Sequence, residues 1–166
     1  MNRYNVMKFY AAMLLFLVSG ILSAADWEVD NLRFRGTLIE SMPCKVSGNN
    51  IIVVDFGSDV QTTLVDGTYK KMQVPYSVQC PTGAPSAMSI RIEGSGAAFD
   101  RNVLLTNITD FGIAILNDDT RLPINSAKEF TYPNWPKLYA VPVKRTGATL
   151  SGGVFNSIAT MRVEYR

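Results

Sequence analysis

The sequence predicts an all-β protein, because short segments of alternating apolar and polar residues follow one another along most of the chain. Turn signals such as Ser47-Gly48-Asn49, Asp66-Gly67 and Gly152-Gly153 separate these segments, and no long amphipathic helix interrupts them. Two cysteines, Cys44 and Cys80, lie in the same region. About seven short strands with one cysteine pair are typical of an immunoglobulin-like β-sandwich.

Each predicted strand is identified by its apolar periodicity. Residues 50–56 form a nearly continuous apolar run, which indicates a strand covered on both faces. Residues 88–93 alternate strictly, which indicates a strand with one buried face. Pro75 and Pro142 lie inside predicted strands and should occupy edges or bulges, because proline cannot donate to a ladder. The predicted strands are residues 32–40, 50–56, 72–80, 88–93, 111–116, 138–144 and 155–166.

The last predicted strand carries its apolar residues on one face, and the chain ends on it. A core strand in this place suggests a sheet whose next position is empty. An empty position exposes unpaired backbone groups and apolar surface, so we expect it to accept a strand from another chain. The apolar face consists of Phe155, Ala159, Met161, Val163 and Tyr165, with the small Ser157 among them.

Residues 1–25 have the pattern of a secretory signal peptide. Arg3 and Lys8 precede an apolar run over residues 9–18, and Ser23-Ala24-Ala25 offers small residues for cleavage after Ala25. The apolar stretch is shorter than the roughly 20 residues that usually span a membrane. Cleavage would leave 141 of the 166 residues, enough for one exported domain without an integral membrane segment.

Charge and composition exclude several classes of function. The signal segment holds two of the 16 basic residues and none of the 14 acidic ones, so the mature chain has a formal charge of zero. Nucleic-acid binding therefore has little electrostatic basis. The chain contains no histidine, which removes Ser-His-Asp catalysis and His-ligated zinc. We expect no enzyme activity, no cofactor and no metal site, and one disulfide between the cysteines of an exported chain.

Residues 26–43 form a predicted N-terminal arm that precedes the disulfide-anchored body. Leu32, Phe34, Gly36 and Leu38 share one face of this strand pattern. Glycine weakens a strand interior unless another chain approaches closely there. The arm either fills the empty position of its own domain or that of a neighbour, and the residues alone leave both alternatives open. Head-to-tail pairing that does not close would produce a fibre.

Several blocks of the chain resemble subunits of chaperone–usher fimbriae, with particular similarity to the minor pilins of P-type pili. The N-terminal blocks are residues 30–39 (DNLRFRGTLI), 43–46 (PCKV) and 53–57 (VVDFG). The others are residues 102–115 (NVLLTNITDFGIAI) and residues 152–166, in which the penultimate residue is a tyrosine. Their order, together with the paired cysteines, extends the resemblance over essentially the whole mature chain.

The resemblance implies an incomplete immunoglobulin-like sandwich that lacks its seventh strand, with a donor strand at residues 26–43 and a pilin domain at residues 44–166. A periplasmic chaperone would lend a strand to the groove and hold the end of the chain at Tyr165 and Arg166. At the outer-membrane usher, the arm of another subunit would replace the chaperone strand. The segment 40–43 before Cys44 is a residue or two longer than in this family, which leaves the register of the last arm positions open.

The resemblance also implies roles for individual residues. Leu32, Phe34, Gly36 and Leu38 would enter a neighbour's groove, with Phe34 starting the exchange and Gly36 in a shallow pocket. Cys44 and Cys80 would form the disulfide of the first strands. The expected groove and core residues are Tyr139, Val141, Val143, Phe155, Ala159, Met161 and Val163.

The expected function is that of a structural minor pilin, an adaptor at or near the tip of an extracellular fimbrium that supports cell adhesion. Its expected partners are the chaperone, the usher and neighbouring subunits, among which a tip adhesin is one candidate. Two alternatives stay open. One is a fimbrial growth terminator, and the other is a self-contained carbohydrate-binding sandwich that uses Trp27, Tyr132, Trp135 and Tyr139 as an aromatic platform.

Overall fold

The computed structural model describes residues 33–37 and 43–166, which belong to separate units of the chain. Residues 33–37 carry no regular secondary structure, and all five side chains are exposed. The predicted signal peptide and the arm residues Leu32 and Leu38 lie outside the described residues. The predictions made for them therefore stay predictions.

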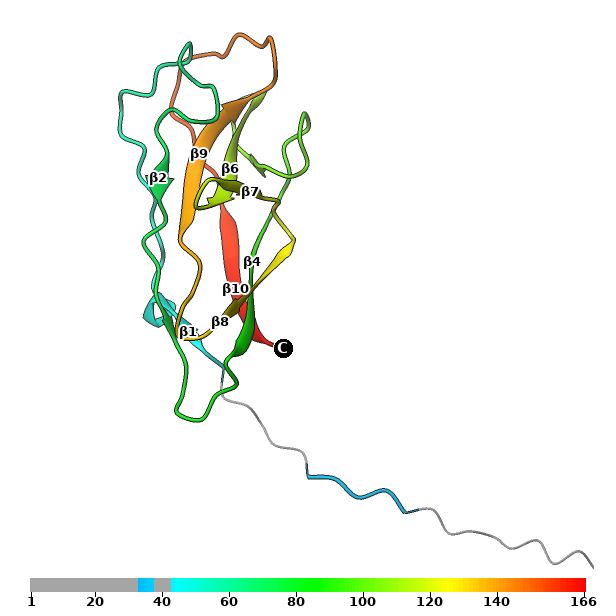
Figure 1. The fold of residues 1–166 in the computed structure, drawn as a ribbon. Coiled ribbons are helices and arrows are strands. Elements are labelled where there is room, and N and C mark those ends of the chain that lie inside the picture. Colours follow the sequence, from blue (N-terminus) through cyan, green and yellow to red (C-terminus); the bar gives the residue numbers. More distant parts are fainter. Residues whose placement is uncertain (1–32, 38–42) are drawn as a thin grey trace, which may run out of the picture. The chain divides into compact units, whose positions relative to one another are not determined.

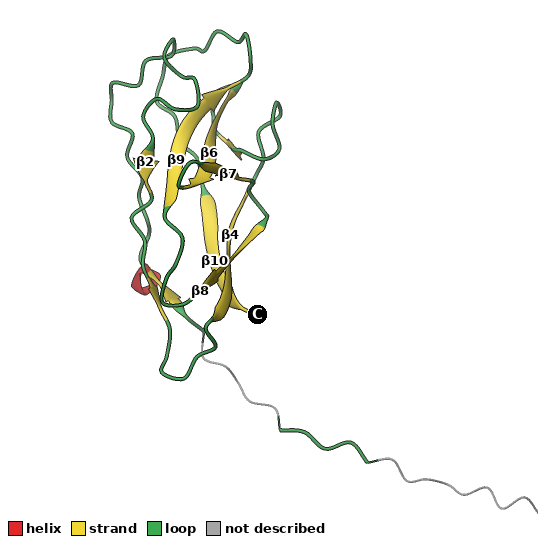
Figure 2. Cartoon of the chain, in the orientation of Figure 1, coloured by secondary structure: helices red, strands yellow, loops and turns green. Residues whose placement is uncertain are grey.

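Residues 43–166 form antiparallel β-structure in three sheets (Figures 1 and 2). The smallest sheet pairs β1 (Lys45–Val46) with β3 (Val78–Gln79), and a short 3₁₀ helix η1 (Ser47–Asn49) follows β1. The second sheet has the order β10 (Ala159–Tyr165), β4 (Ala87–Gly94), β8 (Ala127–Thr131). The third has the order β2 (Met72–Gln73), β9 (Leu138–Lys144), β6 (Phe111–Asn117), β5 (Leu104–Leu105), with β7 (Thr120–Leu122) also paired to β6.

The main core lies where β4 faces β6 and β9. Ile90 and Ile92 of β4 are buried in one cluster with residues of β6 and β9 such as Ile113 and Leu138. Burial of this apolar surface is the dominant favourable term for folding. A second cluster covers the other face of β6 and β9, so both strands are buried on two faces; it consists of Ala97, Val103, Ala114, Val141 and Val143.

The predicted disulfide joins Cys44 to Cys80, with an Sγ–Sγ distance of 2.06 Å. Cys44 immediately precedes β1 and Cys80 immediately follows β3, so the bond closes the end of this antiparallel pair. It ties the start of the body to a segment 36 residues further along the chain. Such a link stabilises the fold mainly by restricting the unfolded chain.

Three predicted strands are present with almost the predicted bounds, namely β4, β6 and β9. The predicted strand at residues 72–80 is divided into β2, which pairs with β9, and β3, which pairs with β1. Pro75 lies in the gap, where the chain changes partner and a ladder donor is not needed. The last predicted strand begins its ladder only at Ala159.

Residues 50–56 differ from the prediction of a strand covered on both faces. They are not paired into a ladder with any described strand, and their burial alternates along the chain. The side chain of Ile51 is 92% exposed and that of Val53 is 67% exposed. The apolar run was misread because the residues that face solvent here are as apolar as those that face the core.

The second sheet ends at β10, which pairs with β4 on one side only among the described strands. All seven residues of β10 are in register with β4, from Ala159 opposite Gly94 to Tyr165 opposite Met88. From Ala159 to Val163, the other edge of β10 has no ladder partner among the described strands and lies beside the core, as the empty position predicted for the last strand requires.

Candidate functional site

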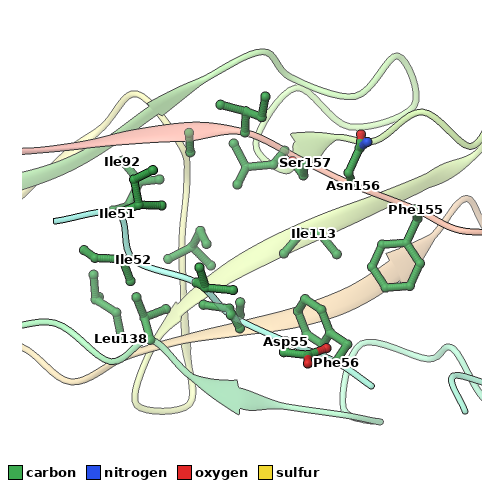
Figure 3. Close-up of a pocket in the computed structure, with 18 of the residues that line it drawn as sticks. Ile51, Ile52, Asp55, Phe56, Ile92, Ile113, Leu138, Phe155, Asn156 and Ser157 are labelled. Atoms are coloured by element: carbon green, nitrogen blue, oxygen red, sulfur yellow. The ribbon is translucent and has the colours of Figure 1, made fainter. Parts of the chain in front are cut away.

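A groove of about 1790 Å³ opens beside this free edge, between two extended segments (Figure 3). We call residues 51–56 the first wall and residues 150–163, which include most of β10, the second wall. The two walls run in opposite directions, since the residue numbers rise along the first wall and fall along the second in Figure 3.

The first wall has two different faces. Ile52, Val54 and Phe56 are half-buried and pack against the main core, whereas Ile51 and Val53 are exposed. No backbone N–H or C=O group of residues 51–56 makes a hydrogen bond with a described residue. Backbone groups in folded proteins are almost always paired, so an unpaired extended segment is a template for another strand.

The second wall is held by β4 in one part and by side chains in the other. Before β10 begins, Asn107 donates its Nδ2 to the Val154 carbonyl at 3.0 Å and accepts from the Asn156 amide at 2.8 Å. The Ser157 hydroxyl donates to the Leu105 carbonyl at 2.7 Å. These side-chain bonds fix the strand-like segment without using its groove-facing edge.

The floor of the groove is the main core itself. Its side chains come from four strands and are all buried, so that an occupant of the groove would lie directly on the core. Covering such a surface with apolar side chains is favourable in proportion to the apolar area removed from water. The floor residues include Ile92, Leu104, Phe111, Ile113, Ile115, Leu138 and Ala140.

Aromatic rings of both walls meet toward one end of the groove. The ring of Phe155 lies 5.8 Å from that of Phe56 and 4.9 Å from that of Phe111, in an edge-on arrangement with Phe111. Figure 3 shows Phe56 and Phe155 at this end and Ile52 and Leu138 toward the other. Side chains of both walls thus meet above the floor here, and the groove is shallow at this end.

The groove carries little charge. Among the described lining residues, the charged side chains are Asp55 and Arg162, and both are exposed at the mouth. Within the described residues, no three His, Cys, Asp or Glu side chains are grouped to hold a metal ion. No helix in that part of the chain is long and apolar enough to cross a membrane.

The structure brings the predicted residues of the last strand together in the groove. Phe155, Met161 and Val163 are half-buried on its inner side, and Ala159, which is exposed, also lines it. These positions follow from the alternation of the terminal segment. The first wall, the floor and Asn107 were missed by sequence reasoning; the surplus of apolar residues at 51–54 was the signal that could have indicated the first wall.

The predicted groove residues of β9 lie on the other side of their sheet. Val141 and Val143 are buried in the second cluster, and Tyr139 does not line the groove. Their neighbours Leu138 and Ala140 face it instead. Of these three residues, expected in the groove and core, Val141 and Val143 are core residues and none lines the groove, because β9 is apolar on both faces and alternation alone does not select one.

The end of the chain lies against the disulfide. Tyr165 donates its hydroxyl to Cys44 Sγ at 3.4 Å, and the Arg166 amide donates to the Ala87 carbonyl at 3.0 Å. The Arg166 guanidinium also lies 2.7 Å from a carboxylate oxygen of Glu129. An exposed ion pair of this kind contributes little to stability.

The aromatic residues of the alternative sugar-binding prediction have separate surroundings. Lys71 Nζ lies 4.3 Å from the centre of the Tyr139 ring, and Tyr132 and Trp135 are half-buried. Among the described residues, ring–ring contacts join only Phe56, Phe111 and Phe155. Trp27 lies outside the described residues.

Comparison with known proteins agrees with this geometry. The family model described as "Fimbrial protein" matches residues 32–166. The chain is 35% identical over 161 residues to the uncharacterized fimbrial-like protein YfcQ of Escherichia coli K12, covering 92% of this chain and 96% of the relative. It is 29% identical over 162 residues to the fimbrial adapter PapF of Escherichia coli, covering 90% and 93% respectively.

The fold has a solved counterpart in the P pilus adaptor subunit PapF. The two structures superpose with a TM-score of 0.58 and 30% identity, over 76% of this chain and 98% of the other. This match confirms the predicted incomplete immunoglobulin-like sandwich with one disulfide and sheets that do not close. By the match of the family model to most of its length, the chain belongs to the fimbrial protein family.

Proposed function

We propose that this chain is an adaptor-type minor pilin of a chaperone–usher fimbria, a structural subunit without catalytic activity. Its groove receives a β-strand from one subunit, and its N-terminal arm supplies a strand to another. The observation that carries this proposal is the groove, whose two walls are extended and apolar on their inner faces, with no described strand between them.

An inserted strand would both pair with the backbone of the two walls and cover the apolar floor of the groove. Its backbone would pair with the unpaired first wall and with the free edge of the second, and its alternate side chains would cover the core. At the end where Phe56 and Phe155 meet, the strand has room only for a small residue. Elsewhere over the floor, large apolar side chains fit the open depth beside Ile52 and Leu138.

The arm at residues 26–43 would donate its strand through Leu32, Phe34, Gly36 and Leu38, while residues 44–166 form the accepting domain. The alternation of the arm supports this role, since it repeats the pattern that the groove requires. Before assembly, a periplasmic chaperone would occupy the groove and hold Tyr165 and Arg166. Removal of residues 1–25 on export and passage through the usher would place the subunit in the extracellular fimbrium.

The position in the fibre is that of an adaptor joining neighbouring subunits, a tip adhesin among them. Two similarities support this position: the name of the sequence relative, a fimbrial adapter, and the structural match to an adaptor subunit. A growth terminator would have the same fold and a groove that no second strand enters. Exchange of a bound peptide for a competing one distinguishes the two, because only an adaptor's groove admits the competitor.

Thermal unfolding tests the proposal. The mature chain, with and without residues 26–43, is melted alone and with a synthetic strand peptide that alternates like residues 30–40. We expect the peptide to raise the melting temperature of the armless chain by tens of degrees, because a ligand of the folded state stabilises it by mass action. A peptide of equal composition with the alternation broken is the matched control, since its apolar residues fall on both faces.

A high melting temperature of the armless chain, unchanged by either peptide, would show that the sandwich is complete without an added strand. The protein would then be a self-contained binding module, and a glycan array would be the next measurement.

A further inference from the structure

The outer lips of the groove are apolar, although they face water. Val53 on the first wall is 67% exposed, and Ile158 on the second is 87% exposed. Ile51 and Val154 are 92% and 89% exposed, and all four line the groove. Four of the seven large exposed apolar side chains within residues 43–166 therefore lie on these lips. Such a concentration of exposed apolar side chains marks a binding surface.

The directions of the two walls place Val53 and Ile158 opposite each other. The rings of Phe56 and Phe155 meet at one end, and the walls run antiparallel from there. Three residues from that contact along each wall lead to Val53 and Ile158, whose side chains point outward. Asp55 and Asn156 lie one residue from the contact along each wall, and both are also exposed. An inserted strand therefore has one outward side chain between two apolar lips and another between a carboxylate and an amide.

The arm of this chain has the wrong chemistry for the apolar position. Its outward residues are Arg33, Arg35 and Thr37, and its inward residues are Leu32, Phe34, Gly36 and Leu38. With the small inward residue Gly36 at the shallow aromatic contact and the arm antiparallel to the second wall, Phe34 lies over the floor beside Val54. In this register Arg33 comes to lie between Val53 and Ile158, and Arg35 lies between Asp55 and Asn156.

Resting on the function proposed above, we propose that Val53 and Ile158 select the incoming strand by its outward side chain and discriminate against the arm of a second copy of this chain. The favoured occupant is a strand of a different fimbrial subunit, with a β-branched or aromatic residue at that outward position. Cross-strand pairs of such residues stabilise a sheet, whereas an arginine there can only extend its stem over the lips. The chain therefore joins unlike subunits and does not polymerise with itself.

Peptide binding to the full mature chain tests this selection. One peptide has the sequence of residues 30–40, and the second carries Arg33→Val with all other residues unchanged. We expect the valine peptide to bind about tenfold more tightly, because its valine forms a cross-strand apolar pair with each lip. A third peptide with Phe34→Asp should not bind, because its inward side is charged.

The reciprocal change is made on the lips. The doubly substituted chain V53E/I158E should reverse the preference and bind the arginine peptide more tightly, because both lips then carry a carboxylate. L64E is the matched control, since Leu64 is an exposed apolar residue that does not line the groove, and it should leave the preference unchanged.

Equal or tighter binding of the arginine peptide to the unaltered chain would overturn the selection by the lips, and so would an unchanged preference in V53E/I158E. Failure of every peptide to bind, the valine peptide included, would overturn the proposed groove function together with this inference. The two failures are thus distinguishable.

Discussion

The first wall and β6 have similar apolar sequences but differ in strand pairing and in burial. Both are short runs of mostly apolar residues, Ile51 to Phe56 in one and Phe111 to Leu116 in the other. Strand β6 pairs with β9 on one side and with β5 and β7 on the other, and its first five residues are buried. The first wall pairs with no described strand, and every second side chain faces water.

The difference shows that a high apolar content indicates that a segment is buried, but not whether its own chain or another molecule buries it. The chain itself covers both faces and both edges of β6. The chain also covers one face of the first wall. In the proposed function, a strand of another molecule pairs with the groove-side edge of this wall. Variants that weaken one region and spare the other measure how separate the two are.

Removal of the disulfide should have the largest effect. C44S/C80S frees the segment that leads into the first wall, and a loop of 36 residues makes the expected loss of unfolding free energy about 4 kcal/mol on the chain-entropy model. Urea denaturation at neutral pH measures it. An unchanged midpoint would show that the first wall and β1 are held by packing alone.

A pair of isoleucine truncations compares the two regions directly. Ile115→Ala in β6 removes a buried side chain and should lower the free energy of unfolding by about 3 kcal/mol. Ile52→Ala in the half-buried first wall should lower it by less than about 1 kcal/mol while the groove is empty. With a strand peptide bound, we expect the loss at Ile52 to approach that at Ile115. Equal losses without peptide would contradict the view that the first wall is incomplete.

Asn107 offers a smaller change on the second wall. Asn107→Ala removes the two hydrogen bonds to Val154 and Asn156 and should lower stability by about 1 kcal/mol. Hydrogen exchange at the Asn156 amide should accelerate, while exchange at amides of β6 should not change. Asn102→Ala, at another exposed asparagine, is the control and should leave the Asn156 amide unaffected.

The smallest effect is expected at the ion pair between Arg145 and Asp110, the residue before β6. Arg145 donates Nε and Nη2 to the two carboxylate oxygens of Asp110 at 2.8 and 2.7 Å, and this bonding lowers the pKa of Asp110 below its ordinary value. A carboxyl group whose pKa is lower in the folded state contributes stability above its unfolded pKa and loses it as the pH falls through the folded pKa.

Asp110→Asn should therefore lower the melting temperature slightly at neutral pH and make the difference between pH 7 and pH 3 smaller than in the unaltered chain. Asp118→Asn, at an exposed acid of the turn after β6, is the control and should keep the original difference. An unchanged pH dependence in Asp110→Asn would show that solvent screening removes the effect of the pair.

Strands with a single buried face or a long apolar run were predictable from the sequence. Strand β4 follows from strict alternation, and β6 and β9 from length and composition. The same kind of run at residues 51–56 misled because the pattern of apolar side chains does not show whether a ladder partner exists. Pro75 was expected at an edge or a bulge, but it lies between β2 and β3, where the chain changes partner from β9 to β1, and this change depends on contacts far along the chain.

The groove was predictable on one side only. Phe155, Met161 and Val163 lie in it because a terminal alternating strand has one core face. The orientation of β9 was not predictable, since Leu138 and Ala140 compete with Tyr139, Val141 and Val143 for the same core. Asn107 carries no sequence signal of its role, because the role depends on residues 154–156 returning to lie beside it.

The contact between Tyr165 and Cys44 links the last strand of the chain to its oxidation state. The bond to Cys80 fixes the position of the sulfur that the phenol contacts beside β10. In a reduced chain, the Cys44 thiol is free to rotate away, and the tyrosine loses a fixed acceptor. Oxidation of the first cysteine therefore adds one contact to a terminal strand that β4 already pairs along all seven residues.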